Sequence, residues 1–252
     1  MSVKILLLDV ETAPLLSYTW GTWDQNIGLN QIHTDTCILS WAAKWYGESK
    51  VMYKDQRNAK DLENEKTILQ DLWKLMDEAH IIVGHNSKKF DVKRINARFL
   101  VHGMKPPSSY KQIDTLTIAK KFFAMTSNKL EYLCKKLNCK VKKLTARKFS
   151  GFELWKECLD RNKEAWKEMQ KYNIQDVLAL EELYNKLIPW DKSIDFNVYN
   201  DNAEEHVCSC GSKKRTKNGW DYTKHLKYQR YTCSNCGKES RDRKAFKRES
   251  QD

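Results

Sequence analysis

The stretch ILLLDVETAP, residues 5–14, decides how the first part of the chain is interpreted. Its run of Ile5 to Leu8 has no helical period, which is typical of a strand buried on both faces in the middle of a sheet. Pro14 ends the strand, and because side chains two apart on a strand point the same way, Asp9 and Glu11 are expected to project together. Two carboxylates held that close repel each other unless a cation lies between them, most often a divalent metal. An isolated D-x-E also occurs in polar turns, so the rest of the chain must decide.

Composition and charge narrow the classes of protein. The 252 residues are enough for one ordinary domain and a small appendage, and 40% hydrophobic residues exclude a disordered chain. The net charge of +12 is typical of proteins that bind polyanions such as nucleic acid, although it also serves solubility alone. No apolar run approaches the roughly 20 residues that span a bilayer, and the N-terminus lacks a signal-peptide pattern. We therefore expect a cytoplasmic protein without a membrane partner, and the scattered cysteines agree with a reducing compartment: Cys37, Cys134, Cys139 and Cys158.

Residues 1–190 alternate strand-like and helix-like segments. Two strands follow the first one and are joined by a turn at Gly47, and a short buried strand, IIVGHN, comes after the first helix. Strands that alternate with helices predict an α/β domain whose helices pack against a mixed sheet. The helical segments expected from apolar spacing are 64–79, 92–103 with Gly103 as C-cap, 112–123 after two prolines, 130–137, and one long helix from Glu153 to Pro189.

The last quarter of the chain differs from the rest. Residues 191–205 carry five acids and one lysine with little apolar pattern, which predicts an acidic linker. Residues 206–252 carry a net charge of +8 and are interpreted as a second, small domain.

Two further segments pair an acid with a characteristic neighbourhood. Asp91 in GHNSKKFDVKR follows a short apolar strand at the expected start of a helix, where an acid is also a common cap. Tyr172 and Asp176 in YNIQDVLAL are four residues apart in a helical pattern, so they share a face, which in the alternative interpretation is only a solvent-exposed pair.

In order, the chain reads D-x-E on a first strand, N-x-x-x-F-D before a middle helix, and Y-x-x-x-D on a late helix. Over residues 1–190 it resembles the DnaQ-like 3′ to 5′ exonucleases of the RNase H-like superfamily, in the tyrosine-containing branch called DEDDy. The histidine branch would require His where Lys171 stands, so the resemblance implies the tyrosine branch. It also implies an RNase H-like mixed sheet flanked by helices and the catalytic residues Asp9, Glu11, Asp91, Tyr172 and Asp176.

The resemblance implies a pair of Mg²⁺ or Mn²⁺ ions, and the chemistry agrees. Phosphodiester cleavage develops charge on the attacking and the leaving oxygen, which two ions stabilise together, and hard cations take oxygen ligands. Following the family, Asp9 bridges both ions, Glu11 and Asp176 bind the ion that activates water, and Asp91 binds the other ion or its waters. Tyr172 is expected to orient the water, because a phenol is a poor base at neutral pH.

Several residues are candidates for contact with the polynucleotide. Asn86 touches the substrate or only holds its loop together, and Trp20, near Tyr18 and Trp23, stacks on bases or packs in the core. Lys143 and Arg147 belong to a basic run that tracks the strand or is simply a solvated face. Asp114 is a secondary acidic candidate that we interpret as a helix cap.

Four clustered cysteines mark the small domain: Cys208, Cys210, Cys233 and Cys236. Such a short polar segment cannot bury enough surface to fold unaided, so the pairs predict one structural zinc ion rather than disulfides. The first pair is C-x-C instead of C-x-x-C, which leaves His206 as an alternative ligand. The segment resembles ribbons of transposase-associated proteins, and its basic residues predict nucleic-acid contacts by Lys214, Arg215 and Arg230, or else docking to a protein.

The leading hypothesis is a metal-dependent 3′ to 5′ exonuclease that acts on DNA, preferably single-stranded, and releases nucleoside 5′-monophosphates while the ribbon holds nucleic acid. An exoribonuclease is the alternative within the same class. A non-catalytic subunit that binds nucleic acid or a polymerase is the alternative from another class. Any polymerase, or other replication or repair protein, would then be a partner supplied by another chain.

Overall fold

The computed structural model describes residues 3–141, 148–199 and 206–246. The chain divides into two compact units. The N-terminal unit comprises Lys4–Thr117 and Thr126–Leu183, and the C-terminal unit comprises Met1–Val3, Ile118–Met125 and Tyr184–Asp252. The division predicted from the sequence, into residues 1–190, a linker 191–205 and a domain 206–252, stays a prediction.

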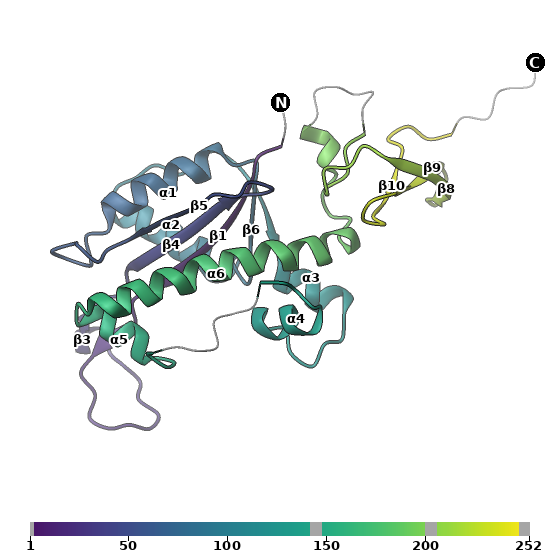
Figure 1. Cartoon of the computed structure of the whole chain (residues 1–252). Helices are drawn as coiled ribbons and strands as arrows, with labels where there is room; N and C mark the ends of the chain where they lie inside the picture. The colour runs from purple at the N-terminus through teal and green to yellow at the C-terminus, as the bar shows by residue number, and fades with distance from the viewer. Residues whose placement is uncertain (1–2, 142–147, 200–205, 247–252) are drawn as a thin grey trace, which may run out of the picture. The chain divides into compact units, whose positions relative to one another are not determined.

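The N-terminal unit is built on a five-stranded sheet with the order β5-β4-β1-β6-β7 (Figure 1). The central strand β1 pairs antiparallel with β4 and parallel with β6, so the sheet is mixed. Helices lie against it, which confirms the predicted α/β fold with a mixed sheet flanked by helices. The strands are β1 (Ile5–Thr12), β4 (Ile38–Trp45), β5 (Val51–Asp55), β6 (Ile81–Gly84) and β7 (Lys111–Asp114).

The helices follow the predicted order with two differences. They are α1 (Lys66–Glu78), α2 (Asp91–Val101), α3 (Thr115–Phe122), α4 (Leu130–Lys136), α5 (Glu153–Leu159) and α6 (Lys163–Leu187). The single helix expected from residue 153 to 189 was wrong, because Arg161 adopts a left-handed φ of 64° and separates α5 from α6. Its guanidinium donates hydrogen bonds to the carbonyls of Ala59 and Lys60, which hold this turn. The helix expected from residue 112 begins only at Thr115, since the residues before it form β7.

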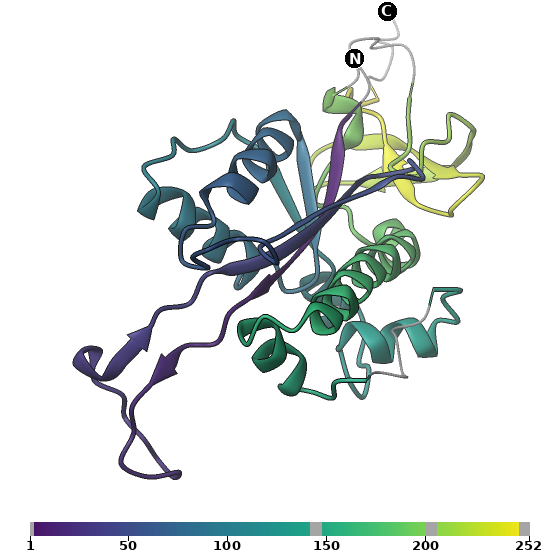
Figure 2. The ribbon, with the colours of Figure 1, turned by 60° about the vertical axis from the view of Figure 1, so that its left-hand side comes forward.

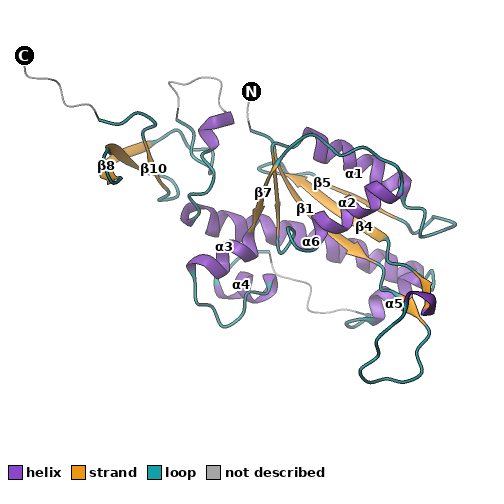
Figure 3. Cartoon of the chain, turned by 180° about the vertical axis from the view of Figure 1, so that it is seen from behind, coloured by secondary structure: helices purple, strands orange, loops and turns teal. Residues whose placement is uncertain are grey.

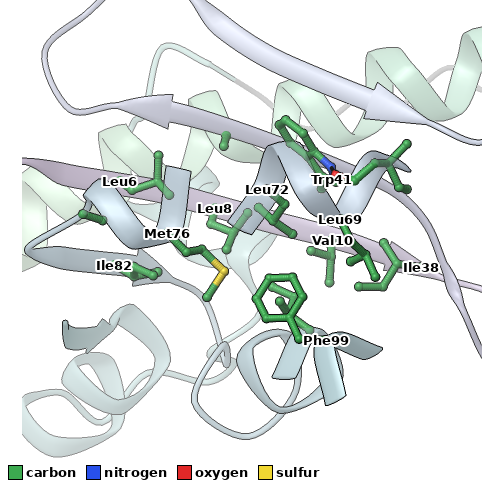
Figure 4. Packing of buried hydrophobic residues seen from close by; sticks show 14 residues of the cluster. Leu6, Leu8, Val10, Ile38, Trp41, Leu69, Leu72, Met76, Ile82 and Phe99 are labelled. Carbon is green, nitrogen blue, oxygen red and sulfur yellow. Dashed lines mark hydrogen bonds between the residues drawn. The ribbon is translucent and has the colours of Figure 1, made fainter. Parts of the chain in front are cut away.

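Alternation along β1 assigns its side chains to two faces. Leu6, Leu8 and Val10 pack into the core formed with α1 and α2, where they meet Met76 and Phe99 (Figure 4). Burying a leucine of this kind contributes roughly 1.5–3 kcal/mol. The intervening side chains therefore face the opposite side of the sheet, and α6 lies there, across the sheet from α1 and α2 (Figure 2).

Between β1 and β4 the chain leaves the sheet as a hairpin that we call the arm, residues 15–34. The arm contains the short antiparallel strands β2 (Leu16–Ser17) and β3 (Ile32–Thr34) and the 3₁₀ helix η1 (Leu29–Gln31). In Figure 2 the arm, in purple and dark blue, projects away from the five-stranded sheet.

The C-terminal unit carries a second, antiparallel sheet with the order β10-β9-β8 (Figure 3). Part of the predicted linker packs within this unit: Phe196 is buried, and the Lys238 ammonium lies 5.3 Å from the centroid of its ring. Among the described residues no helix has the length and apolar character needed to cross a membrane. The remaining elements are β8 (Arg215–Tyr222), β9 (Lys227–Cys233), β10 (Glu239–Arg241), η2 (Ile188–Trp190) and η3 (Phe196–Tyr199).

Candidate metal centre

Carboxylates from two segments that are far apart in the sequence meet at the end of β1. Asp9 and Glu11 extend from β1 and Asp176 extends from α6, and one ligand oxygen of each lies within 4.8 Å of the others. Glu11 and Asp176 are buried, and Asp9 is half-buried. The structure thus brings together three of the four acids that the sequence predicted as ligands of the catalytic metal ions.

The fourth acid, Asp91, lies beside this group on the first turn of α2. Its Oδ1 accepts a hydrogen bond from the Val10 N–H at 3.2 Å. The parallel pairing of β1 with β6 ends at Leu7 opposite Val83, so β1 continues past its neighbour. Asp91 therefore binds the backbone of β1 where that neighbour is missing, and its charge acts on Asp9.

The loop between β6 and α2 sets the position of Asp91. Asn86 adopts a left-handed φ of 67°, which Asn tolerates better than most residues. The Asp114 carboxylate accepts hydrogen bonds from the N–H groups of Asn86 at 2.9 Å and Lys88 at 3.2 Å. It also accepts one from the Leu116 N–H at 3.0 Å and so caps α3, as the sequence predicted. Asp114 thus both holds the loop before α2 and caps the N-terminus of α3.

Tyr172 lies on α6 one helical turn before Asp176. Its side chain is buried, and its ring meets that of Trp155 edge to face, with centroids 5.9 Å apart. Since residues four apart on a helix share a face, the phenol and the Asp176 carboxylate lie on the side of α6 that faces β1.

Asn173 belongs to the centre and was not predicted. Its Nδ2 donates a hydrogen bond to Asp9 Oδ2 at 2.6 Å, and its Oδ1 accepts one from the Ser40 hydroxyl at 3.1 Å. The available sequence signal was spacing, because Asn173 stands three residues before Asp176 and so shares its face of the helix.

Burial disfavours the charged forms of Asp9 and Asp91, and the charges of neighbouring acids add to this effect. Burial raises the pKa of Asp9 well above its usual value, and the charges of Glu11, Asp91 and Asp176 raise it further, while the Asn173 hydrogen bond lowers it. Burial also raises the pKa of Asp91 to about 6, against the N–H groups that bind its carboxylate. A cation among these oxygens would relieve the repulsion, and an all-oxygen donor set suits Mg²⁺ or Mn²⁺ better than softer metals.

A cavity of about 610 Å³ is lined in part by sequence neighbours of two of the acids. It begins at Thr12, the residue after Glu11, and includes Phe90, the residue before Asp91. The Arg94 guanidinium carbon lies 5.2 Å from the centroid of the Phe90 ring, so the cavity combines apolar walls with a positive charge. Its lining consists of Thr12, Ala13, Pro14, Leu15, Thr36, Phe90, Arg94, Phe152 and Trp155.

The four clustered cysteines also come together, in the C-terminal unit. Sγ of Cys208 lies 3.5 Å from that of Cys236, and Sγ of Cys210 lies 3.7 Å from that of Cys233. These distances exclude disulfides and are close to the edge of about 3.8 Å expected for a tetrahedron of thiolates around zinc. The four thiols therefore fit a zinc ion. The ring of His206 lies outside this group and is bonded to Asn197 and Ser240.

The predicted nucleic-acid contacts have different surroundings. The Trp20 side chain is 99% exposed, so the alternative that it packs in the core was wrong. Lys214 is exposed, whereas the Arg215 guanidinium stacks 3.8 Å from the Tyr231 ring centroid and Arg230 Nε donates to the Asn218 carbonyl at 2.7 Å. Asn86 acts through its backbone as described above. Lys143 and Arg147 lie outside the described residues.

Comparison with known proteins supplies the family. A stretch of 73 residues, 29% of the chain, is 38% identical to DNA polymerase III PolC-type from Ureaplasma parvum serovar 3, of which it covers 5%. The family B DNA polymerase of the archaeon Pyrobaculum calidifontis shares the fold, with a TM-score of 0.54 over 75% of this chain and 25% of the polymerase, at 14% identity. The chain therefore spans only a small part of either polymerase. The model of the RNase H superfamily matches residues 28–188, well over half of the sequence. The chain belongs to the RNase H superfamily.

Proposed function

We propose that this chain is a metal-dependent 3′ to 5′ exonuclease of the DEDDy type that hydrolyses single-stranded DNA to nucleoside 5′-monophosphates. The observation that carries the proposal is the meeting of Asp9, Glu11 and Asp176 within 4.8 Å, with Asp91 bound to the backbone beside them. The resemblance of these motifs, in this order, to those of the DEDDy 3′ to 5′ exonucleases supports the proposed polarity of the reaction.

The four acids, Asp9, Glu11, Asp91 and Asp176, would together hold two Mg²⁺ or Mn²⁺ ions. When bound, such ions stabilise the charges that develop on the attacking and leaving oxygens of a phosphodiester. Asn173 holds the Asp9 carboxylate in one orientation through its 2.6 Å hydrogen bond. Tyr172, on the same face of α6, would orient the attacking water through its hydroxyl.

The cavity beside the centre is the proposed position of the 3′-terminal nucleoside. Its aromatic walls, Phe90, Phe152 and Trp155, offer surfaces on which a base stacks whatever its identity. Arg94 would bind a phosphate or sugar oxygen, because its Nη1 is already oriented by the Thr36 hydroxyl at 3.2 Å. Recognition by stacking suits an enzyme that removes any nucleotide.

The four cysteines would hold a structural zinc ion, which would make the segment 206–252 a zinc ribbon that retains nucleic acid. The exposed Lys214 and the net charge of this end of the chain support that role. DNA is the proposed substrate because both similar proteins named above are DNA polymerases. An association in trans with a polymerase follows as a further part of the proposal.

The direct test uses a 5′-labelled single-stranded DNA and its RNA counterpart with Mn²⁺ or Mg²⁺, and EDTA as the metal-free reference. We expect a ladder that shortens from the 3′ end of DNA only with metal, and a loss of roughly 1,000-fold or more in rate for Asp9→Asn. Glu131→Gln, an exposed acid on α4, is the matched control and should retain the wild-type rate. Intact strands under all conditions, with binding preserved, would instead favour a non-catalytic binding subunit.

A further inference from the structure

The arm presents aromatic side chains that the rest of the unit leaves in solvent. Trp20 is 99% exposed, Trp23 is 86% exposed and Tyr18 is 68% exposed. Large exposed apolar surfaces of this kind mark binding sites in soluble proteins, and a Trp or Tyr ring contributes much contact area for little lost conformational freedom. The arm is therefore a candidate binding surface.

The arm is held in shape by its own polar side chains. The Gln31 Nε2 donates to the Tyr18 carbonyl at 3.0 Å, and the Gln31 Oε1 accepts a hydrogen bond from the Gly28 N–H at 2.8 Å. The Tyr18 N–H in turn donates to the Gln31 carbonyl at 2.9 Å. Gln31 thus cross-links the two sides of the hairpin while the tryptophans stay outside these bonds.

The arm follows closely after β1, the strand that carries Asp9 and Glu11. Its root, Thr12–Leu15, is at once the continuation of the strand that carries Glu11 and one wall of the aromatic cavity. The Ala13 N–H donates to the Cys37 carbonyl at 2.8 Å, and the Thr36 hydroxyl donates to the Ala13 carbonyl at 2.9 Å, so this root is fixed to the sheet. Leu15, the first residue of the arm, also lines the cavity, so a ligand in the cavity lies beside the base of the arm.

The near absence of charged residues in the arm indicates which part of a nucleic acid it would contact. Residues 15–34 contain no Lys or Arg, and Asp24 is their single formal charge, although the whole chain carries +12. Such a segment does not attract phosphates. Planar rings without cations suit the faces of bases, which stack on aromatic side chains irrespective of sequence.

We propose that the arm stacks on the unpaired bases upstream of the 3′ terminus, so that the site engages a single strand several nucleotides long. This inference rests on the proposed exonuclease function for the identity of the strand. It adds a substrate requirement: a single-stranded 3′ segment long enough to extend from the cavity to the arm.

Binding is tested apart from catalysis in an Asp9→Asn background with Ca²⁺. The probe is a twelve-nucleotide oligothymidylate, followed by tryptophan fluorescence and by anisotropy of a 5′ label. We expect quenching of the arm tryptophans, and a weakening of about 5- to 100-fold for each stacking ring replaced in Trp20→Leu or Trp23→Leu. Trp20→Phe and Trp23→Phe should retain most of the affinity, because Phe keeps a planar face and Leu keeps only apolar character. Leu100→Ala, an exposed apolar side chain on α2, is the control and should bind as the wild type does.

The outcomes separate the two proposals. In an active background, the loss of kcat/KM in the Leu variants should be larger for the twelve-nucleotide strand than for a trinucleotide. Equal affinity of the Leu variants and the wild type would overturn the inference, as would self-association by sedimentation that disappears in those variants, since the arm would then be a protein-docking surface. Absence of hydrolysis by the wild type, with arm-dependent binding intact, would overturn the exonuclease proposal alone.

Discussion

The Asn173 side chain joins Asp9 of β1 to Ser40 of β4 from its position on α6, with hydrogen bonds of 2.6 and 3.1 Å. Asn173 is fully buried, so both of its polar ends are satisfied inside the protein. The same bond lowers the pKa of Asp9, whereas burial and the neighbouring acids raise it. One amide therefore fixes the orientation of the acid on which the others converge and favours its charged form.

Asn173→Ala is expected to weaken divalent-metal binding and to lower kcat/KM by about 10- to 100-fold, as is usual when a residue that orients a metal ligand is lost. The measurement is the Mn²⁺ concentration that gives half-maximal rate, which should rise, with partial recovery of activity at high Mn²⁺. Lys171→Ala, an exposed side chain on the same helix, should leave that concentration unchanged. A lower melting temperature with an unshifted Mn²⁺ midpoint would assign Asn173 a structural role only.

Asp91→Asn is expected to stabilise the metal-free protein at neutral pH. The folded pKa of Asp91 is raised to about 6, against an ordinary value near 3.9, so folding takes up a proton between about pH 6 and pH 4. The wild type therefore gains stability as the pH falls through this window and loses it as the pH rises, by at most about 1.4 kcal/mol per pH unit. Asn keeps an oxygen for the Val10 N–H but has no charge to bury.

The measurement is the free energy of urea unfolding from pH 3.5 to 8 in EDTA for both proteins. The advantage of Asp91→Asn should be near zero below pH 4 and reach on the order of 2–3 kcal/mol above pH 7. Added Mn²⁺ should reverse the order, because only the wild type gains a metal ligand. A variant less stable than the wild type at pH 7.5 in EDTA would contradict the assignment.

Most of the correctly predicted strands and helices were recognised from the periodic spacing of apolar residues. The apolar run of β1 and the helical spacing of apolar residues in α1, α2 and α6 show which side chains are buried. This pattern can be read from the residue types of each segment alone. The four acids were proposed as one site because their motifs, in order along the chain, resemble those of the DEDDy exonucleases: Asp9 and Glu11 stand on β1, Asp91 begins α2 and Asp176 lies within α6. The break at Arg161 was missed because the apolar pairs Cys158–Leu159 and Ala165–Trp166 stand seven residues apart and so keep one helical phase, although the residues between them are all polar.

Other features depend on tertiary contacts that no short stretch encodes. Asn173 is one polar residue among several on α6, and only the approach of β1 makes it a partner of Asp9. The arm has strands of two and three residues, too short for a period-two pattern, so the sequence indicated only its aromatic residues Tyr18, Trp20 and Trp23. The role of Asp114 in holding the Asn86 loop likewise depends on the pairing of β6 with β7.

Removal of zinc is expected to unfold the three-stranded sheet β10-β9-β8 and leave the five-stranded sheet of the N-terminal unit intact. The purified protein should contain one equivalent of zinc, and Cys233→Ser should lose it, because the four thiols fit a tetrahedral site and small polar domains of this type fold with their metal. Metal analysis and limited proteolysis check both statements. Cys37→Ala, a buried cysteine of the N-terminal unit, should retain zinc. Retention of zinc by Cys233→Ser would contradict the assignment of these four cysteines as the zinc ligands.

Gly84→Ala is expected to lower both stability and kcat/KM, because Gly84 ends β6 and packs against the loop that leads to Asp91 at the start of α2. A Cβ at Gly84 would lie 2.4 Å from the Ser87 Cβ and 3.4 Å from the Leu8 carbonyl oxygen, so the loop must shift. Overpacking of this kind costs about 1–3 kcal/mol. The double variant Gly84→Ala/Ser87→Gly removes the colliding atoms, so its kcat/KM should be higher than that of Gly84→Ala. Ser87→Gly alone measures the cost of losing the Ser87 side chain, and this cost should be smaller than the recovery. Urea unfolding and 3′ to 5′ hydrolysis of a labelled strand measure the two effects. If the double variant were no more active than Gly84→Ala, the contact between Gly84 and Ser87 would not be what positions Asp91.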